Sequence, residues 1–232
     1  MAKTKTLRLA MLRATTSFTS GFHGNPLEEL LKAADAAKPD ILVGPEFLFY
    51  NRWEKDESTP YTKRKKQEIC EELAVKTKGI LLIPGTFIWK KGKKLFNSAP
   101  VIFGGELKHE YLKYTDGGSC KIAEDHSLNY SAGDEGGLSF PWKGITIGLE
   151  ICLDHYFGIL GSRDAKTDLH LITSCGQDIY ERSSTAREGG YAAICNGIRI
   201  GTNKVKMKIT GKLFDWASEN IKENADVYEL EI

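Results

Sequence analysis

The sequence predicts a layered α/β fold in which helices join some strands and hairpins join others. Two patterns alternate along the chain: short branched or alternating apolar runs, typical of strands, and segments with apolar residues three or four positions apart, typical of helices. Glycine turns at Lys91-Gly92 and Gly104-Gly105 separate neighbouring strand runs, which indicates antiparallel hairpins. Because the two patterns are mixed throughout, we expect stacked layers in which some neighbouring strands are antiparallel.

Composition narrows the function classes before any motif is considered. The chain has 232 residues, of which 41% are hydrophobic and 27% charged, which is typical of a folded protein with a full core. No repeat or composition shift marks a boundary, so we expect one domain over residues 1–232. Lys plus Arg is 32 and Asp plus Glu is 31, so the net charge of +1 predicts no nucleic acid and no anionic membrane as main partner. No apolar run approaches the roughly 20 residues that span a bilayer.

The N-terminal third predicts a strand, a helix and a second strand. Apolar residues occupy alternate positions over Leu7–Arg13, which indicates a strand. Asn25 is a suitable N-cap and Pro26 suits the first helical position, so a helix is expected from there until Pro39 ends it. The short branched run Ile41–Val43 is typical of a buried strand.

The middle of the chain predicts a helix followed by strands. Residues Pro60–Lys78 have apolar side chains on one face and many lysines on the other, and the run Lys63–Lys66 is interpreted as a solvated helix face. Strands are expected at Ile80–Ile83 and, paired across a turn, at Val101–Phe103 and Leu107–Lys113.

The C-terminal part predicts four strands and one helix. Strands are expected at Ile145–Ile151, Asp168–Thr173, Lys204–Thr210 and Val227–Ile232, with a helix over Ser183–Asn196.

The segment from Tyr114 to Gly137 has no sustained period and contains several glycines. Loops of this length are usually functional or disordered. Because it contains aromatic residues and Cys120, we expect an ordered loop near a functional site.

The chain has five cysteines, which are Cys70, Cys120, Cys152, Cys175 and Cys195. Their odd number and wide spacing argue against a disulfide framework, and the lack of a Cys-x-x-Cys pair argues against a zinc ribbon. Reduced thiols suit a cytoplasmic protein. The histidines are scattered and no glycine-rich phosphate loop is present, so neither a metal site nor a cofactor is expected.

Three of the most apolar strand runs lead to reactive side chains, Glu46, Lys113 and Cys152. Ligands of open α/β sheets bind beyond the carboxyl ends of strands. There a thiolate could attack an electrophilic carbon, an ammonium could hold the oxyanion, and a carboxylate could pass the thiol proton to a leaving amine. Alternatively, Glu46 and Lys113 form an ion pair at a sheet edge and Cys152 is an inert buried thiol.

The motifs around these residues resemble those of the nitrilase superfamily of carbon–nitrogen hydrolases, which use a Glu-Lys-Cys triad in this order. The matching stretches, in chain order, are Val43-Gly44-Pro45-Glu46, Asn97-Ser98-Ala99, Tyr111-Leu112-Lys113, Ser131-Ala132-Gly133-Asp134 and Gly148-Leu149-Glu150-Ile151-Cys152-Leu153-Asp154. The resemblance implies a four-layer α-β-β-α sandwich, a cysteine nucleophile at Cys152 and a homodimer or larger homo-oligomer.

The resemblance also implies a second active-site glutamate between the lysine and the cysteine. Glu124 is the candidate, with Asp125 and Glu135 as rivals and a solvated loop carboxylate as the alternative. On the substrate side we expect Asp154, because the resemblance links this position to the substrate class. We also expect His155, three residues after Cys152, to line the pocket, with a helix cap as the alternative, and Cys175, which follows another strand end, to form part of the pocket wall.

The residues after the cysteine bear on the substrate. Nitrile-cleaving members commonly have Trp-Glu there, whereas amide- and carbamoyl-cleaving members commonly have an aromatic residue and Asp; this chain has Leu153-Asp154. The resemblance therefore favours hydrolysis of a small amide or carbamoyl compound. Nitrile hydrolysis is the second hypothesis, and a binding protein with the same fold and no catalytic activity is the third.

Overall fold

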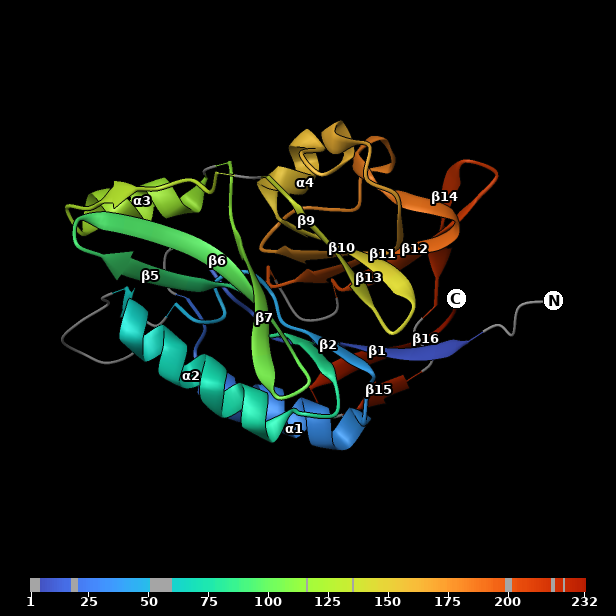
Figure 1. The fold of residues 1–232 in the computed structure, drawn as a ribbon, viewed down its shortest axis with the longest axis horizontal. Coiled ribbons are helices and arrows are strands. Elements are labelled where there is room, and N and C mark those ends of the chain that lie inside the picture. Colours follow the sequence, from blue (N-terminus) through green and yellow to red (C-terminus); the bar gives the residue numbers. More distant parts are fainter. Residues whose placement is uncertain are drawn as a thin grey trace.

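Two β-sheets pack face to face, with two long helices beneath the first sheet and a short helix above the second (Figure 1). The computed structural model describes residues 5–17, 21–50, 60–115, 117–134, 136–198, 202–217, 220–222 and 224–232.

The first sheet has the strand order β15-β16-β1-β2-β4-β6-β5-β3, with β7 and β8 paired to β6. Its strands are β1 (Thr6–Leu12), β2 (Ile41–Val43), β3 (Tyr61–Thr62), β4 (Leu81–Ile83), β5 (Phe87–Lys91), β6 (Lys94–Phe103), β7 (Glu106–Leu112), β8 (Asn129–Tyr130), β15 (Asn220–Lys222) and β16 (Ala225–Glu231). Strands β1, β2 and β4 are parallel, whereas β5, β6 and β7 form the two hairpins predicted from the glycine turns.

The second sheet has the order β14-β13-β12-β11-β10-β9. Its strands are β9 (Leu138–Trp142), β10 (Ile145–Ile151), β11 (Thr167–Ser174), β12 (Ala186–Asn196), β13 (Lys204–Ile209) and β14 (Lys212–Trp216). The central strands β10, β11 and β12 are parallel.

The helices are α1 (Pro26–Ala37), α2 (Lys63–Lys76), α3 (Gly118–Asp125) and α4 (Leu153–Phe157), with 3₁₀ turns η1 (Gly161–Arg163) and η2 (Glu181–Ser183). The predicted start of α1 is confirmed, because the Asn25 side chain accepts a hydrogen bond from the Glu28 backbone N–H and Pro26 follows it. No described helix has the length and apolar character needed to cross a bilayer.

The main core lies between the two sheets, and a second core lies between the first sheet and helices α1 and α2. Strand β1 faces both, since Leu9 and Met11 enter the main core while Ala10 and Leu12 pack toward the helices. The predicted sandwich is therefore confirmed. Its outer layer over the second sheet consists of the short α4 and the 3₁₀ turns.

The helix predicted over Ser183–Asn196 is wrong, because most of this segment forms β12. Residues 191–196 are buried, between β11 on one side and β13 on the other. A central strand covered on both faces has a continuous apolar run, which periodicity cannot distinguish from a buried helix. The adjacent pair Gly189-Gly190 disfavours a helix, and Gly189 adopts φ 76°.

The predicted loop from Tyr114 to Gly137 is ordered over its described residues and contains both α3 and β8. Helix α3 begins at Gly118 and has no side-chain N-cap bond, so its start carries no capping signature in the sequence.

Candidate active site

Strand ends of the two sheets bring Glu46, Lys113 and Cys152 to one place in the sandwich. Glu46 follows β2 and Lys113 follows β7, both in the first sheet, whereas Cys152 follows β10 in the second. The residues of β2 and β10 share the main core, and Glu46 and Lys113 both lie close enough to Cys152 to shift the pKa of its thiol.

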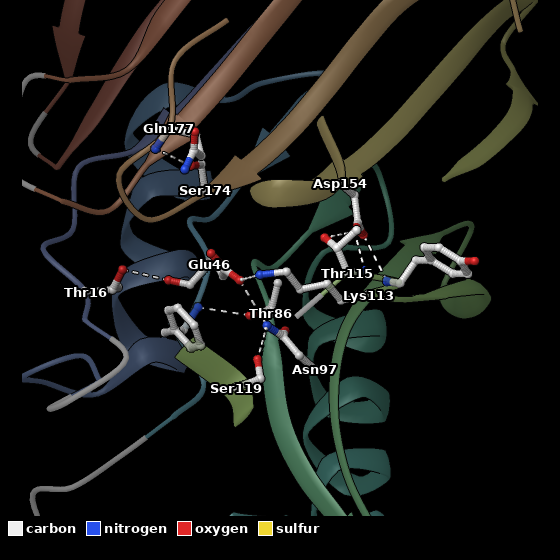
Figure 2. Close-up of polar contacts among 12 residues, drawn as sticks. Thr16, Glu46, Thr86, Asn97, Lys113, Thr115, Ser119, Asp154, Ser174 and Gln177 are labelled. Atoms are coloured by element: carbon white, nitrogen blue, oxygen red, sulfur yellow. Dashed lines mark hydrogen bonds and ion pairs between the residues drawn. The ribbon is translucent and has the colours of Figure 1, made fainter. Parts of the chain in front are cut away.

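Glu46 and Lys113 form a buried ion pair, and the side chain of each is 1% exposed. Lys113 Nζ donates to Glu46 Oε1 at 2.6 Å, and Figure 2 shows the lysine side chain extended toward the carboxylate. A buried charge needs a partner of this kind, because desolvation otherwise costs several kcal/mol.

Asn97 on β6 fixes both members of this pair. Its side-chain Nδ2 donates to Glu46 Oε1 at 3.0 Å and lies 3.1 Å from Ser119 Oγ, while its backbone C=O accepts the Lys113 N–H at 2.9 Å (Figure 2). Among the residues that the structure describes, the other carboxylate oxygen, Glu46 Oε2, is buried without a hydrogen-bond partner. One oxygen of Glu46 is thus held in place and the other is free to accept a proton.

The backbone around Glu46 is held from three sides. Thr16 Oγ1 donates to its carbonyl oxygen at 2.6 Å, and its N–H donates to the Ser174 carbonyl oxygen at 3.3 Å. Thr86 Oγ1 accepts the next backbone N–H, that of Phe47, at 2.9 Å. These contacts fix where the carboxylate points.

Cys152 occupies a strained turn between β10 and α4. Its φ of 48° and ψ of −104° are rare for a residue with a side chain, and such strain persists only where surrounding contacts impose it. The Cys152 N–H donates to the Thr173 carbonyl oxygen at 2.9 Å, and its own carbonyl oxygen accepts the His155 N–H at 3.1 Å. Strained non-glycine residues cluster at active sites.

The charges of the site oppose one another at the Cys152 thiol. Burial raises the pKa of Cys152 to about 12 and Glu46 adds to the rise, whereas Lys113 and the Cys175 backbone N–H lower it. Burial by itself would lower the pKa of Lys113, but Glu46 and Cys152 outweigh burial and the net shift is upward. The lysine is therefore charged at neutral pH and the resting thiol is protonated, so formation of a thiolate at Cys152 needs a base.

Asp154, predicted on the substrate side, is instead buried in an internal network. Its carboxylate accepts a hydrogen bond from the Thr115 N–H at 2.6 Å (Figure 2). It also accepts hydrogen bonds from the Tyr111 hydroxyl and from the Tyr114 N–H at 3.0 Å. Because these partners flank Lys113, Asp154 ties the turn that carries Cys152 to the strand end that carries the lysine.

His155, also predicted on the substrate side, is fully buried, and both of its ring nitrogens have partners. Nδ1 lies 3.0 Å from Glu150 Oε2, and Nε2 accepts the Tyr180 N–H at 3.0 Å. Cys175 is half-buried and its thiol lies 3.2 Å from the Thr16 carbonyl oxygen. Of the three predicted substrate contacts, the structure brings Cys175 beside the Cys152 sulfur, through its backbone N–H.

Glu124 does not join the Glu46–Lys113 pair. Its side chain is 71% exposed and lies 3.5 Å from Lys121 on the same helix, and Asp125 also pairs with Lys121. Glu135 lies outside the described residues. Helix α3 reaches the site through Ser119, which no sequence signal distinguished from other loop serines.

The burial of His155 makes a prediction about acid stability. Burial lowers the pKa of His155, although Glu150 and Asp178 oppose the shift. The pKa of this histidine in the unfolded chain is about 6.5, so below that pH the unfolded chain binds more protons at His155 than the folded protein does. The contribution of His155 to the free energy of unfolding is therefore complete above about pH 6.5 and declines as the pH falls below it. We expect His155→Asn to reduce the free energy of unfolding more at pH 7.5 than at pH 5.5, as measured by urea unfolding.

A cost of His155→Asn that is equal at both pH values, or larger at pH 5.5, would contradict the assignment of His155 as neutral.

Neither a family model nor a curated protein matches the chain. Solved structures do: a glutamine-dependent NAD+ synthetase from Acinetobacter baumannii is 16% identical with a TM-score of 0.67, over 97% of this chain and 45% of that one. This chain thus spans less than half the length of the synthetase.

Two further structures match over most of both chains. An amidase from Nesterenkonia sp. is 15% identical with a TM-score of 0.65, covering 97% of this chain and 90% of the amidase. Nit3 from Saccharomyces cerevisiae, a member of branch 10 of the nitrilase superfamily, is 17% identical with a TM-score of 0.63, covering 98% and 90%. Similarity at this level of identity concerns the fold, and the fold of this chain is that of the nitrilase superfamily.

Proposed function

We propose that the protein hydrolyses a carbon–nitrogen bond of a small amide or carbamoyl compound through a thioester on Cys152. The observation that carries the proposal is the buried Glu46 carboxylate, whose Oε1 is held by Lys113 at 2.6 Å while Oε2 has no partner in the described part of the chain. Buried unpaired oxygens are costly, so one that is retained beside a thiol favours a role in proton transfer.

In the first half-reaction, Glu46 accepts the Cys152 proton as the sulfur attacks the substrate carbonyl carbon. The new S–C bond converts the carbonyl oxygen to an oxyanion, and the Lys113 ammonium stabilises this charge. When the intermediate collapses, the C–N bond breaks and Glu46 passes its proton to the leaving nitrogen, which departs as ammonia or an amine.

In the second half-reaction, Glu46 deprotonates a water molecule that attacks the thioester carbon. The S–C bond then breaks, the acid leaves, and the thiol recovers its proton. In both half-reactions the proton is accepted by Glu46 Oε2, while Oε1 stays hydrogen-bonded to Lys113.

The fold neighbours support cysteine chemistry on amides. A glutamate-to-leucine mutant of the Nesterenkonia amidase was solved with the acetamide moiety of fluoroacetamide covalently added at its active site cysteine. The preference for amides over nitriles in this chain rests on Leu153-Asp154 after the nucleophile. A homodimer or larger assembly, a cytoplasmic location and a role for Glu124 stay predictions.

The base is tested by replacing Glu46 with glutamine, which keeps the shape and removes the proton acceptor. We expect Glu46→Gln to bind substrate but to lose ammonia release by about 10²–10⁴-fold, the usual contribution of a general base. Release is measured by stopped flow over a panel of small amides, carbamoyl compounds and nitriles.

Glu72→Gln on the exposed face of α2 is the matched control and should behave as the unmodified protein. A normal ammonia burst from Glu46→Gln would contradict the proposal, and an equal loss from Glu124→Gln would assign proton transfer to that residue. Turnover of nitriles in place of amides would replace the substrate class and leave the thioester mechanism standing.

A further inference from the structure

A buried carboxylate and two histidines surround the turn that carries Cys152, and the proposed mechanism does not use them. Glu150 on β10, His155 on α4 and His170 on β11 are each 0% exposed. His155 Nδ1 and His170 Nε2 lie 3.0 Å and 2.9 Å from the same oxygen, Glu150 Oε2. The other oxygen, Oε1, accepts the Leu160 N–H at 2.7 Å.

Backbone donors fix the tautomer of each histidine. The Tyr180 N–H donates to His155 Nε2 at 3.0 Å, and the Thr185 N–H donates to His170 Nδ1 at 3.2 Å. A ring nitrogen that accepts a hydrogen bond carries no proton, so each neutral ring has its proton on the nitrogen nearest Glu150. Burial would raise the pKa of Glu150, but the two histidines beside its carboxylate outweigh burial and lower the pKa to about 2.

The same donors argue against a metal ion, although the three ligand atoms are close enough together to hold one. A histidine that binds a metal through one nitrogen carries a proton on the other, which must find an acceptor. Here the ring nitrogens that point away from Glu150, in His155 and in His170, each face a backbone N–H. If a metal bound the other nitrogen of each ring, these nitrogens would be protonated, and two hydrogen-bond donors would face each other without an acceptor. The cluster fits a hydrogen-bonded network instead.

The network spans the strained turn. Glu150 precedes Cys152 and His155 follows it, so the contact between their side chains closes a ring over the residue with φ 48° and ψ −104°. Leu160, Tyr180 and Thr185 attach three further segments to the same cluster. These contacts surround Cys152 and hold its backbone in a conformation that is rare for a residue with a side chain.

We propose that Glu150 and His155 are positioning residues that hold the Cys152 turn in its strained conformation and thereby keep the thiol beside Glu46. His170 braces Glu150 from β11. This role rests on the proposed function of Cys152, and it predicts that the network acts on the reactivity of the thiol and not on substrate affinity.

The test measures Cys152 in two ways, by kcat and KM on the best amide and by the rate of alkylation with iodoacetamide relative to exposed Cys120 in the same sample. For Glu150→Gln and His155→Leu we expect kcat per folded molecule to fall by about 10-fold or more with KM nearly unchanged, since small misplacements of a reacting group cost up to about 10²-fold. The relative alkylation rate should fall by a similar factor, because Glu46 no longer reaches the thiol proton. His155→Asn, which keeps an N–H donor near the position of Nδ1, should recover part of both.

Asp226→Asn is the matched control, because Asp226 is a buried carboxylate on β16 that accepts from Asn203 at 3.0 Å. It should lower the Tm without changing kcat or alkylation per folded molecule. Folded Glu150 and His155 variants with normal kcat and normal alkylation would overturn the proposal. If the protein turns over no amide, the alkylation ratio still decides the positioning role, so the two failures are distinguishable.

If the variants do not fold, a measurement on the unmodified protein still tests the proposed network. Nitrogen-15 NMR of the imidazole rings should find that Nε2 of His155 and Nδ1 of His170, which face backbone N–H groups, carry no proton. A proton on either of these two nitrogens would overturn the network.

Discussion

Replacing Cys152 with alanine should abolish amide turnover while leaving the fold intact. The thiol is the group that forms the thioester in the proposed mechanism, and loss of a nucleophile commonly costs about 10⁴-fold or more in kcat. The change removes one buried sulfur at a position whose backbone contacts, to Thr173 and His155, stay in place. Ammonia release measures the activity and circular dichroism measures the fold.

Cys195→Ala is the matched control, because it removes a fully buried thiol from β12. It should lower stability and keep the turnover of each folded molecule. More than a trace of activity in Cys152→Ala, with contamination by another amidase excluded, would refute the nucleophile.

Replacing Lys113 with methionine should reduce both rate and stability. Loss of one oxyanion donor costs about 10²–10³-fold in kcat. Removing one partner of a buried ion pair leaves the other charge uncompensated and destabilises a protein by about 3–5 kcal/mol. Glu46 is 1% exposed, so it cannot regain solvation without opening the site.

The double variant Lys113→Met with Glu46→Gln separates the two effects. It removes both charges, so the free energy of unfolding should recover while kcat stays low. Lys66→Met controls for loss of a buried lysine, because Lys66 on α2 pairs with Glu110 on β7. Its Nζ lies 4.3 Å from the centre of the Trp89 ring, on the helix-covered face of the first sheet. Near-normal turnover by folded Lys113→Met would contradict the oxyanion role.

Local patterns predicted most of the framework of the fold. Alternation identified β1, the Asn25-Pro26 signal located the start of α1, and glycine turns identified both hairpins of the first sheet. Strand β12 was missed because tertiary burial on both faces removes the periodicity that distinguishes strand from helix. The short helix α3 was missed because its start has no capping side chain.

The site was predictable to the extent that it depends on where strands end. Glu46 and Lys113 were expected to meet, and their contact depends on the ends of two strands in one sheet. The roles of Asp154 and His155 were not predictable, since their partners come from Thr115 and Tyr180, in other segments of the chain. The exposure of Glu124 depends on which face of α3 points to solvent. The sequence of this segment has no regular hydrophobic periodicity, so that face could not be predicted.

Mass measurement of an acyl group on Cys152 tests directly whether this thiol forms the thioester. The protein is mixed with a panel of small amides, quenched in acid within milliseconds, digested and analysed by mass spectrometry. We expect the peptide containing Cys152 to gain the mass of the acyl group and the adduct to disappear on the time scale of turnover. The peptides containing Cys120 and Cys175 should stay unmodified. Amide turnover without any adduct on Cys152, or with the acyl group on another residue, would contradict the proposed mechanism.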